Sequence, residues 1–230
     1  MKNQKQPPPV AERILDGALR LLAKEGPGAL QARAIAAACG MSSMVVYSHF
    51  GGVPELVTAM TERGFVKFAA ALGETPVSSD PVFDLFSMAL ASRRFALENP
   101  HLYDLMFGLS ARATYRPGAR DSAHRAAALS AFRAGHQHLL AASERLARSG
   151  RVTRRAPETL AAQLWSYVHG FVSLELAGHF EAFDDPVATV LAPLGVALCV
   201  GMGDSPARAR ASHAAVLRMA KERRGSRRRA

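Results

Sequence analysis

Residues 31–56 read QARAIAAACGMSSMVVYSHFGGVPEL, and this stretch decides the fold. A first short helix is expected to end at Gly40, because a glycine supplies the tight turn that can follow a helix. Ser42 then stands where a hydroxyl can cap a second helix. Each helix carries apolar residues spaced for one face: Ile35, Ala36 and Cys39 on the first, and Val45, Val46, Tyr47 and Phe50 on the second.

This pattern has two interpretations. Two short helices joined by a glycine turn form a helix-turn-helix, whose second helix fits the major groove of DNA. The same spacing also fits an ordinary hairpin of two helices inside an all-helical domain, since glycine turns between helices are common. Spacing alone leaves both interpretations open.

The identities of the residues separate the two. The segment resembles the DNA-binding domain of the TetR family of bacterial transcriptional regulators, in which a typical stretch reads Ile-Ala, Ala-Gly-Val-Ser, Leu-Tyr-x-His-Phe and Lys-Glu-Glu-Leu. The resemblance runs from about residue 13 to residue 56, and Tyr47, His49, Phe50 and Leu56 stand at the matching offsets from Gly40. It implies an N-terminal three-helix helix-turn-helix domain followed by a C-terminal helical bundle.

Three positions depart from the family pattern. Gln31 stands where a helix-capping Thr is usual, Val45 where a Thr that can touch a base or phosphate is usual, and Val53 where a phosphate-facing Lys is usual. The expected fold survives these changes. The contacts that the family makes with DNA at residues 45 and 53 do not carry over.

The DNA contacts are predicted around the glycine turn. Residues 42–49 would enter the major groove, with Tyr47 and His49 on phosphates and Arg33 on a phosphate or a guanine edge. Met44 and Val45 are limited to apolar contacts, for instance with a thymine methyl group. The predicted DNA-binding residues are Ala32, Arg33, Ser42, Ser43, Met44, Val45, Tyr47 and His49.

The composition favours helices over sheets. Ala and Leu dominate, only two Ile occur (Ile14 and Ile35), and no alternating Val, Thr or aromatic run accompanies a hairpin turn. We therefore expect an all-α chain, whose 230 residues suffice for one large domain or two small ones.

Proline and glycine divide this chain into segments. Residues 1–9 are expected to form a flexible arm, residues 10–53 the helix-turn-helix domain, residues 54–203 a ligand-binding and dimerisation domain, and residues 204–230 a basic tail. A helix over residues 54–72 would link the two domains, and the turn-rich stretch 73–81 is the expected boundary. Further helices are predicted at residues 82–98, 100–109, 120–149, 157–183, 186–202 and 206–222.

The net charge of +10 is concentrated at the two ends. Counting Lys and Arg against Asp and Glu, residues 1–53 carry +3, residues 54–202 carry 0 and residues 203–230 carry +7. A basic head fits a nucleic-acid surface, and the neutral middle argues against DNA wrapping around the whole protein. The Arg-rich end, expected to be disordered past about residue 222, either adds salt-sensitive DNA affinity or is a solvated terminus without a role.

The cysteines and the apolar stretches indicate the compartment. Cys39 and Cys199 stand far apart in apolar contexts, which predicts two small buried hydrophobes and not a disulfide or a metal pair. No apolar signal core follows the N-terminus, and the longest apolar stretch, near residues 187–202, is short for a membrane span. A cytoplasmic protein without membrane contact is expected.

The sequence carries no recognisable catalytic constellation. Glu98 and His101 have the spacing of a metal site in a helical bundle, but Pro100 interrupts the helix and a second such motif is absent. No nucleophile elbow, Walker loop or dinucleotide fingerprint occurs. We therefore expect no enzyme, no metal and no cofactor.

A second motif lies near the C-terminus. Trp165, His169 and Gly170 resemble the Trp-His-Gly signature of one class of TetR-family C-terminal domains, whose helices at and after this position form a four-helix bundle with a second subunit. For Trp165 and His169, a place in the core of one subunit is the alternative. Gly170 and Gly178 stand eight residues apart, so on one continuous helix they would share a face. Another helix could come close to such a face, which favours an interface. The predicted dimerisation residues are Gly170, Leu174, Gly178, Val187, Leu191, Leu194 and Leu198.

The resemblance also implies an effector cavity in the second domain. Aromatic residues and methionines recur there at helical spacing, a pattern that fits a plain core as well as a cavity. Few charges fall in these stretches, so a hydrophobic or aromatic effector is favoured over a sugar or a phosphate. The predicted ligand-binding residues are Phe86, Phe95, Tyr103, Met106, Phe107, Phe132, Trp165 and His169.

The predicted function is that of a DNA-binding transcriptional regulator. The resemblance implies a ligand-responsive repressor that acts as a homodimer on a palindromic double-stranded operator. Effector binding would change the spacing of the two heads through the linking helix. The alternatives are a helical enzyme or small-molecule-binding protein with an incidental helix-turn-helix, and a TetR-like activator.

Overall fold

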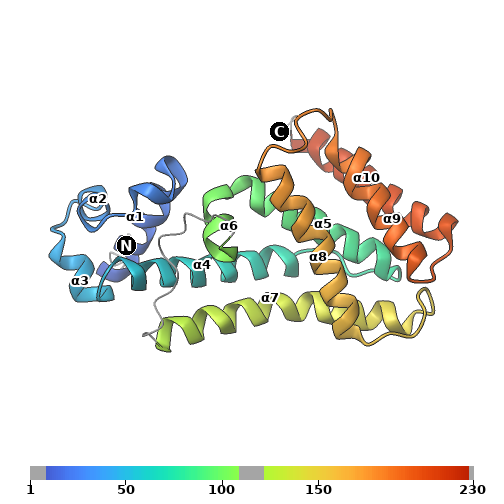
Figure 1. The fold of residues 1–230 in the computed structure, drawn as a ribbon, viewed down its shortest axis with the longest axis horizontal. Helices are drawn as coiled ribbons and strands as arrows, with labels where there is room; N and C mark the ends of the chain where they lie inside the picture. Colours follow the sequence, from blue (N-terminus) through green and yellow to red (C-terminus); the bar gives the residue numbers. More distant parts are fainter. Residues whose placement is uncertain (1–8, 109–121, 228–230) are drawn as a thin grey trace, which may run out of the picture. The chain divides into compact units, whose positions relative to one another are not determined.

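The computed structural model describes residues 9–108 and 122–227. The predicted N-terminal arm up to residue 8 and the last three residues of the predicted tail lie outside the described residues. In the described part of the chain there are ten α-helices and no strand (Figure 1), so the prediction of an all-α fold is confirmed.

The first four helices are α1 (Val10–Glu25), α2 (Ala32–Ala38), α3 (Met44–Phe50) and α4 (Val53–Gly73). The remaining six are α5 (Pro81–Glu98), α6 (Pro100–Phe107), α7 (Ser122–Arg148), α8 (Pro157–Leu176), α9 (Ala192–Gly201) and α10 (Pro206–Arg227). A single 3₁₀ turn at Pro27–Ala29 follows α1, and a π-helical segment at Val187–Leu191 precedes α9.

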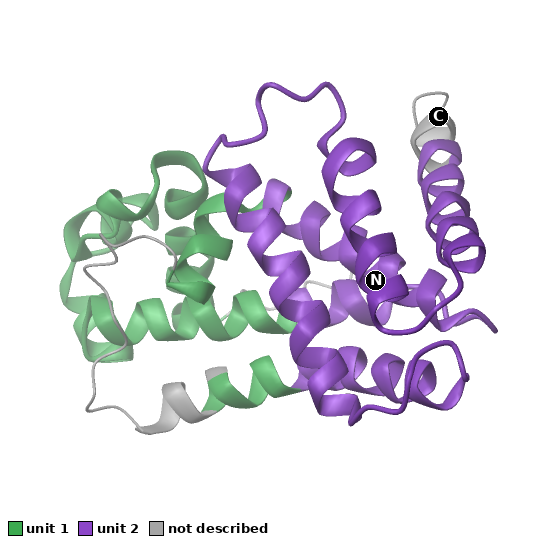
Figure 2. Ribbon diagram, turned by 45° about the vertical axis from the view of Figure 1, so that its right-hand side comes forward, with its two compact units in different colours: residues 1–67, 98–133 green, residues 68–97, 134–230 purple. Residues whose placement is uncertain are grey.

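The chain divides into two compact units (Figure 2). Unit 1 comprises residues 1–67 and 98–133, and unit 2 comprises residues 68–97 and 134–230. The division falls inside α4 and not in the turn-rich stretch 73–81, because the middle of α4 packs with α6 and the first half of α7. The Phe65 ring lies edge-on to Phe107 at 5.5 Å and to Phe132 at 5.4 Å between centroids.

The core of the N-terminal helices is small and tightly packed. Ile14 and Leu22 of α1, Ile35 of α2 and Val46 of α3 are all at most 1% exposed. At Gly17 the helices come closest, since a Cβ there would lie 2.2 Å from the Cys39 sulfur. The helix-turn-helix therefore rests on α1, as expected for the three-helix domain that the resemblance implies.

Helix α8 ends at Leu176, earlier than the predicted residue 183. Gly178 adopts a left-handed φ of +81°, its N–H donates to the Glu175 carbonyl, and the His179 N–H donates to the Leu174 carbonyl. This pair of bonds is a Schellman motif, which terminates a helix. Gly170 and Gly178 consequently do not share a helix face, and that part of the dimer prediction is wrong.

The segment predicted as a basic tail is a helix of unit 2. Ala209 and Val216 of α10 are fully buried, and Asp204, just before the helix, is 4% exposed. The helix continues to Arg227, five residues beyond its predicted end at residue 222. Its Arg residues dominate the composition, but its small apolar residues at helical spacing pack into the body.

Candidate functional site

The turn of the helix-turn-helix is built around Gly40. Its φ is +67°, its N–H donates to the Ala37 carbonyl at 3.1 Å, and the Met41 N–H donates to the Ala36 carbonyl at 2.9 Å. This is again a Schellman motif, which requires the left-handed conformation that glycine adopts without strain. The predicted role of Gly40 is confirmed.

Helix α3 begins at Met44, two residues later than predicted. Ser43 occupies the cap position with a helical backbone, and no serine hydroxyl caps the helix. The backbone carbonyls of Ser42 and Ser43 instead accept from Val45 and Val46 at 3.1 Å each. The prediction that the Ser42 side chain caps α3 is therefore wrong, and this hydroxyl projects from an exposed residue.

One face of α3 is open to solvent while the opposite face is buried. Met44 is 69% exposed and Tyr47 is 52% exposed, whereas Val46 is fully buried against α1 and α2. Ser48 shares the exposed face and was not predicted as a contact, although its spacing from Met44 places it there. Its hydroxyl donates to the Val45 carbonyl at 3.1 Å.

The eight predicted DNA-binding residues all lie around this turn. Arg33, Ser42, Met44, Tyr47 and His49 are exposed, and Ala32, Ser43 and Val45 are half-buried. The assignment of DNA contacts to these residues stays a prediction.

On the N-terminal helices, exposed basic residues outnumber exposed acidic ones. Arg63 of α4 lies 2.6 Å from Glu12 and 3.7 Å from Asp16, so it neutralises two acids of α1. Arg33 is exposed and forms no ion pair with any described residue. An unpaired guanidinium beside a helix-turn-helix is suited to phosphate or guanine.

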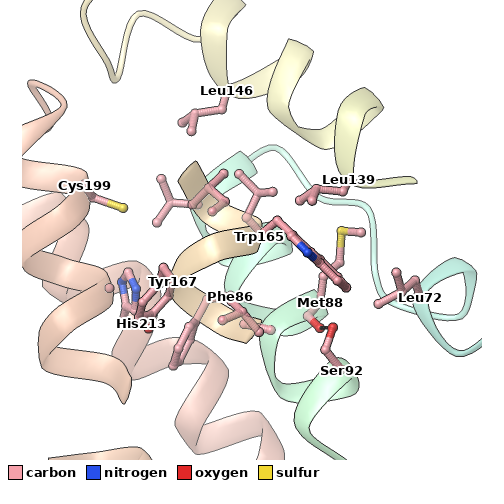
Figure 3. Close-up of a pocket in the computed structure, with 16 residues that line it drawn as sticks. Leu72, Phe86, Met88, Ser92, Leu139, Leu146, Trp165, Tyr167, Cys199 and His213 are labelled. Atoms are coloured by element: carbon pink, nitrogen blue, oxygen red, sulfur yellow. Dashed lines mark hydrogen bonds between the residues drawn. The ribbon is translucent and has the colours of Figure 1, made fainter. Parts of the chain in front are cut away.

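Unit 2 encloses a second candidate site, a cavity of about 50 Å³ (Figure 3). Most of the wall comes from α5, α7, α8, α9 and α10, and the end of α4 contributes Leu72. The lining is apolar apart from a few hydroxyl, thiol and imidazole groups, and no Lys, Arg, Asp or Glu lines it. The lining residues are Leu72, Val82, Leu85, Phe86, Met88, Ala89, Ser92, Leu139, Leu146, Leu164, Trp165, Tyr167, Val168, Gly195, Cys199 and His213.

The structure separates the predicted ligand-binding residues into three groups. Phe86 and Trp165 line the cavity. Phe95 and His169 lie in unit 2 but do not line it: the His169 ring stacks on Trp165 at 5.4 Å, and the Phe95 ring lies edge-on to Phe68 at 5.2 Å. The other four pack in unit 1, in the aromatic cluster around Phe65 or beside Gly64: Tyr103, Met106, Phe107 and Phe132. These four do not line the cavity.

Sequence reasoning missed the polar residues of the cavity. Ser92, Tyr167, Cys199 and His213 come from four helices, and His213 belongs to the segment predicted as a tail. No motif links them in the sequence. A buried face on the last helix, with Ala209, His213 and Val216 at helical spacing, was the available signal.

Seven residues were predicted to form the dimer interface. Leu174 and Leu194 are exposed at 47% and 51%, Leu198 is half-buried, and nothing lies within 4 Å of where a Cβ of Gly170 would stand. Val187 and Leu191 are buried inside unit 2, because the π-helical segment turns both inward. These two side chains are therefore not available at its surface, and their assignment to the interface is wrong.

The described residues offer neither a metal site nor a membrane span. Among the described residues, no three His, Cys, Asp or Glu side chains gather as a metal ion would require. No helix in the same part of the chain has the length and apolarity to span a bilayer. Both cysteines are free thiols.

Two family models match the chain. The model of bacterial regulatory proteins of the tetR family matches residues 14–60, and the model of the tetracyclin repressor-like C-terminal domain matches residues 85–194. The chain belongs to the TetR family and is a DNA-binding transcriptional regulator, so the resemblance seen in residues 13–56 is confirmed.

Solved structures share the fold at low sequence identity. A protein of unknown function from Rhodococcus sp. RHA1 is 20% identical, with a TM-score of 0.70 over 88% of this chain and 100% of that one. A regulatory protein of the tetR family from Rhodococcus RHA1 is 21% identical, with a TM-score of 0.63 over 86% and 100%. The fatty acid degradation regulator FadR from Bacillus halodurans is 13% identical, with a TM-score of 0.64 over 87% and 100%. No curated protein sequence matches the chain.

Proposed function

We propose that the protein is a ligand-responsive repressor that acts as a homodimer on a palindromic operator. The observation that carries this proposal is the course of helix α4 (Val53–Gly73). It starts directly after α3 and its turn, and Leu72 in its last turn lines the cavity. A ligand that reshapes the cavity therefore acts on the helix that follows α3, provided that it binds one arrangement of that helix more tightly than the other.

In the proposed complex, α3 lies in the major groove. Tyr47, His49 and the free Ser42 hydroxyl bind phosphates, Arg33 binds a phosphate or a guanine edge, and Met44 contacts a thymine methyl group. The repressor acts in the cytoplasm, where bacterial DNA lies.

The proposed dimer uses helices α8 and α9. The exposed Leu174 and Leu194, together with the open space at Gly170, support this surface, because apolar side chains beside a glycine allow a second helix to pack closely. Two linked heads bind two half-sites, so a dimer gains affinity that a single head lacks.

Selection of DNA from a random pool by the purified protein tests this proposal. We expect a palindrome with half-sites about one helical turn apart, roughly 10 base pairs or slightly more. A panel of neutral and anionic hydrophobic compounds should contain members that release the selected DNA in a mobility-shift assay. Selection of an isolated half-site, or of no common sequence, would contradict the dimeric repressor.

A further inference from the structure

Three polar side chains gather at one end of the cavity of unit 2, away from Ser92. Tyr167, Gly195, Cys199 and His213 form this end, and Figure 3 shows Tyr167 and His213 side by side there, away from Leu72 and Met88. The hydrogen-bonding state of this end decides which ligands the cavity accepts. The following inference rests on the proposed function in taking the cavity as the effector site.

The Tyr167 hydroxyl and His213 Nδ1 both donate their protons to backbone carbonyls. The Tyr167 hydroxyl donates to the Leu191 carbonyl. His213 Nδ1 lies 2.8 Å from the Ala209 carbonyl, which can only accept, so Nδ1 carries the proton. In a neutral imidazole the other nitrogen is then an acceptor, and no described residue donates to His213 Nε2.

The imidazole is neutral near pH 7. Burial lowers the pKa of His213 and outweighs the hydrogen bond to the Ala209 carbonyl, which raises it. The charge of Arg151 lowers the pKa further, while the carboxylates of Asp80 and Asp204 act in the opposite direction. Burial also raises the pKa of the Cys199 thiol to about 11, so that it stays protonated and offers only a weak donor. The polar end thus presents acceptors to an incoming molecule.

The two acceptors converge in front of Gly195. A Cβ on Gly195 would lie 2.6 Å from His213 Nε2 and 2.8 Å from the Tyr167 oxygen. The His213 and Tyr167 side chains therefore pack directly against the backbone of α9, and any residue with a side chain at 195 would push them away.

We propose that the cavity binds a neutral, mainly apolar molecule with one hydrogen-bond donor, such as a phenolic or alcoholic hydroxyl, which donates to His213 Nε2. Ethers and esters offer only lone pairs, which would face the lone pair of Nε2. Carboxylates would also lack a cation in the lining. The Arg151 guanidinium, whose charge acts on His213, is held by Asp80 and Asp204.

The size of the cavity adds a second condition. An apolar cavity of about 150 Å³ accommodates benzene, whereas this one measures about 50 Å³. A ring-sized ligand must therefore displace side chains on binding. Met88, at the opposite end from His213, has the flexible side chain best suited to move. Ligand binding thereby widens the cavity near Leu72 of α4.

Calorimetry with the full-length protein at pH 7.5 tests the proposal, using phenol, anisole, toluene and benzoate as probes. One net hydrogen bond predicts that phenol binds roughly two- to tenfold more tightly than toluene or anisole, and that benzoate binds more weakly than phenol. His213→Phe keeps a ring against Phe86 but removes the acceptor, so it should abolish the preference for phenol. Met88→Leu, a volume-conserving change in the same cavity, should retain it.

The ¹⁵N shift of His213 Nε2 in the unmodified protein gives an independent readout if the His213→Phe variant does not fold. Phenol should move this resonance and toluene should not. Equal binding of phenol, anisole and toluene, unaffected by His213→Phe, would overturn the donor requirement while leaving an effector cavity. Failure of all four probes to bind would overturn the inference, and mobility shift with the selected DNA would show separately whether the DNA-binding proposal stands.

Discussion

Arg33 and Tyr47 illustrate how single side chains are left available for DNA. Arg33 is exposed with no ion pair among the described residues, and Tyr47 extends from the open face of α3 while Val46 beside it anchors the helix. Neither side chain contributes to the core. Their chemistry is therefore free to act on a partner.

We predict that Arg33→Ala and Tyr47→Phe each weaken operator binding by roughly tenfold, because each removes a hydrogen bond to DNA. For Arg33→Ala, the salt dependence of binding should also decrease by about one unit of slope. Fluorescence anisotropy at several salt concentrations measures both effects. Arg155→Ala, which removes an equally exposed charge from unit 2, is the control and should bind the operator normally. Normal binding by both head variants would place the interface elsewhere.

His213 gives stability a dependence on pH. Burial lowers the pKa of His213 in the folded state, whereas the unfolded chain keeps the ordinary value of 6.5. Below this pH the unfolded state therefore binds more protons than the folded state. The free energy of unfolding should therefore decrease as the pH falls from about 6.5 towards 5. Burial lowers the pKa of His169 as well, so this group contributes in the same direction.

Urea unfolding at a series of pH values measures this effect. The decrease below pH 6.5 should be shallower in His213→Phe than in the unmodified protein, since the variant has lost one of the two groups. A pH profile parallel to that of the unmodified protein would show that His213 does not titrate on unfolding.

At the scale of elements, Arg151 joins three parts of unit 2. Its guanidinium lies 2.5 Å from Asp80, which caps α5, and 2.5 Å from the buried Asp204, which precedes α10. It also donates to Ser212 of α10 at 3.0 Å. Burial alone would lower the pKa of Arg151, but the hydrogen bond to Asp204 and the two carboxylate charges raise it overall.

We predict that Arg151→Met lowers the free energy of unfolding by about 3 kcal/mol, because the buried Asp204 carboxylate loses the guanidinium at 2.5 Å and keeps only that of the exposed Arg208 at 3.5 Å. Urea denaturation followed by circular dichroism measures the loss. Arg155→Met is the matched control and should change stability by no more than about 0.5 kcal/mol, as an exposed substitution. A similarly small effect at Arg151 would mean that water replaces the guanidinium without cost.

For the whole molecule, the proposed assembly depends on side chains that one chain leaves uncovered. Leu194 of α9 is half exposed, and Gly170 of α8 faces open space, so neither is needed for the core of a single subunit. Substitutions at these positions therefore separate assembly from folding.

We predict that Leu194→Lys and Gly170→Leu give folded monomers that bind the operator more weakly by orders of magnitude, because a single head makes half the contacts. Light scattering and circular dichroism measure assembly and folding separately. Leu97→Lys changes an equally exposed leucine on α5 and should remain dimeric. Dimers in all three variants would move the interface away from α8 and α9.

The helical class, the helix-turn-helix and the family could all be predicted from the sequence. These features depend on neighbours in the chain: the left-handed turn at Gly40, the period of the apolar residues, and the offsets of Tyr47 and His49. Local spacing of this kind can be read directly, and for the same reason most helix starts beside a proline were predicted to within one residue.

The residues that line the cavity could not be predicted in the same way, because they come together only when the helices pack. Tyr167, Gly195 and His213 come from three helices, and packing alone brings them within reach of one another. It also divided the predicted aromatic residues, placing Trp165 in the cavity wall and Phe132 in the cluster of unit 1, since the period of a helix marks a buried face but not what that face packs against. For the same reason, the residues of α10 were predicted to form a basic tail. The charge of this segment is visible in the composition, but its opposite face is buried only by the helices that pack against it.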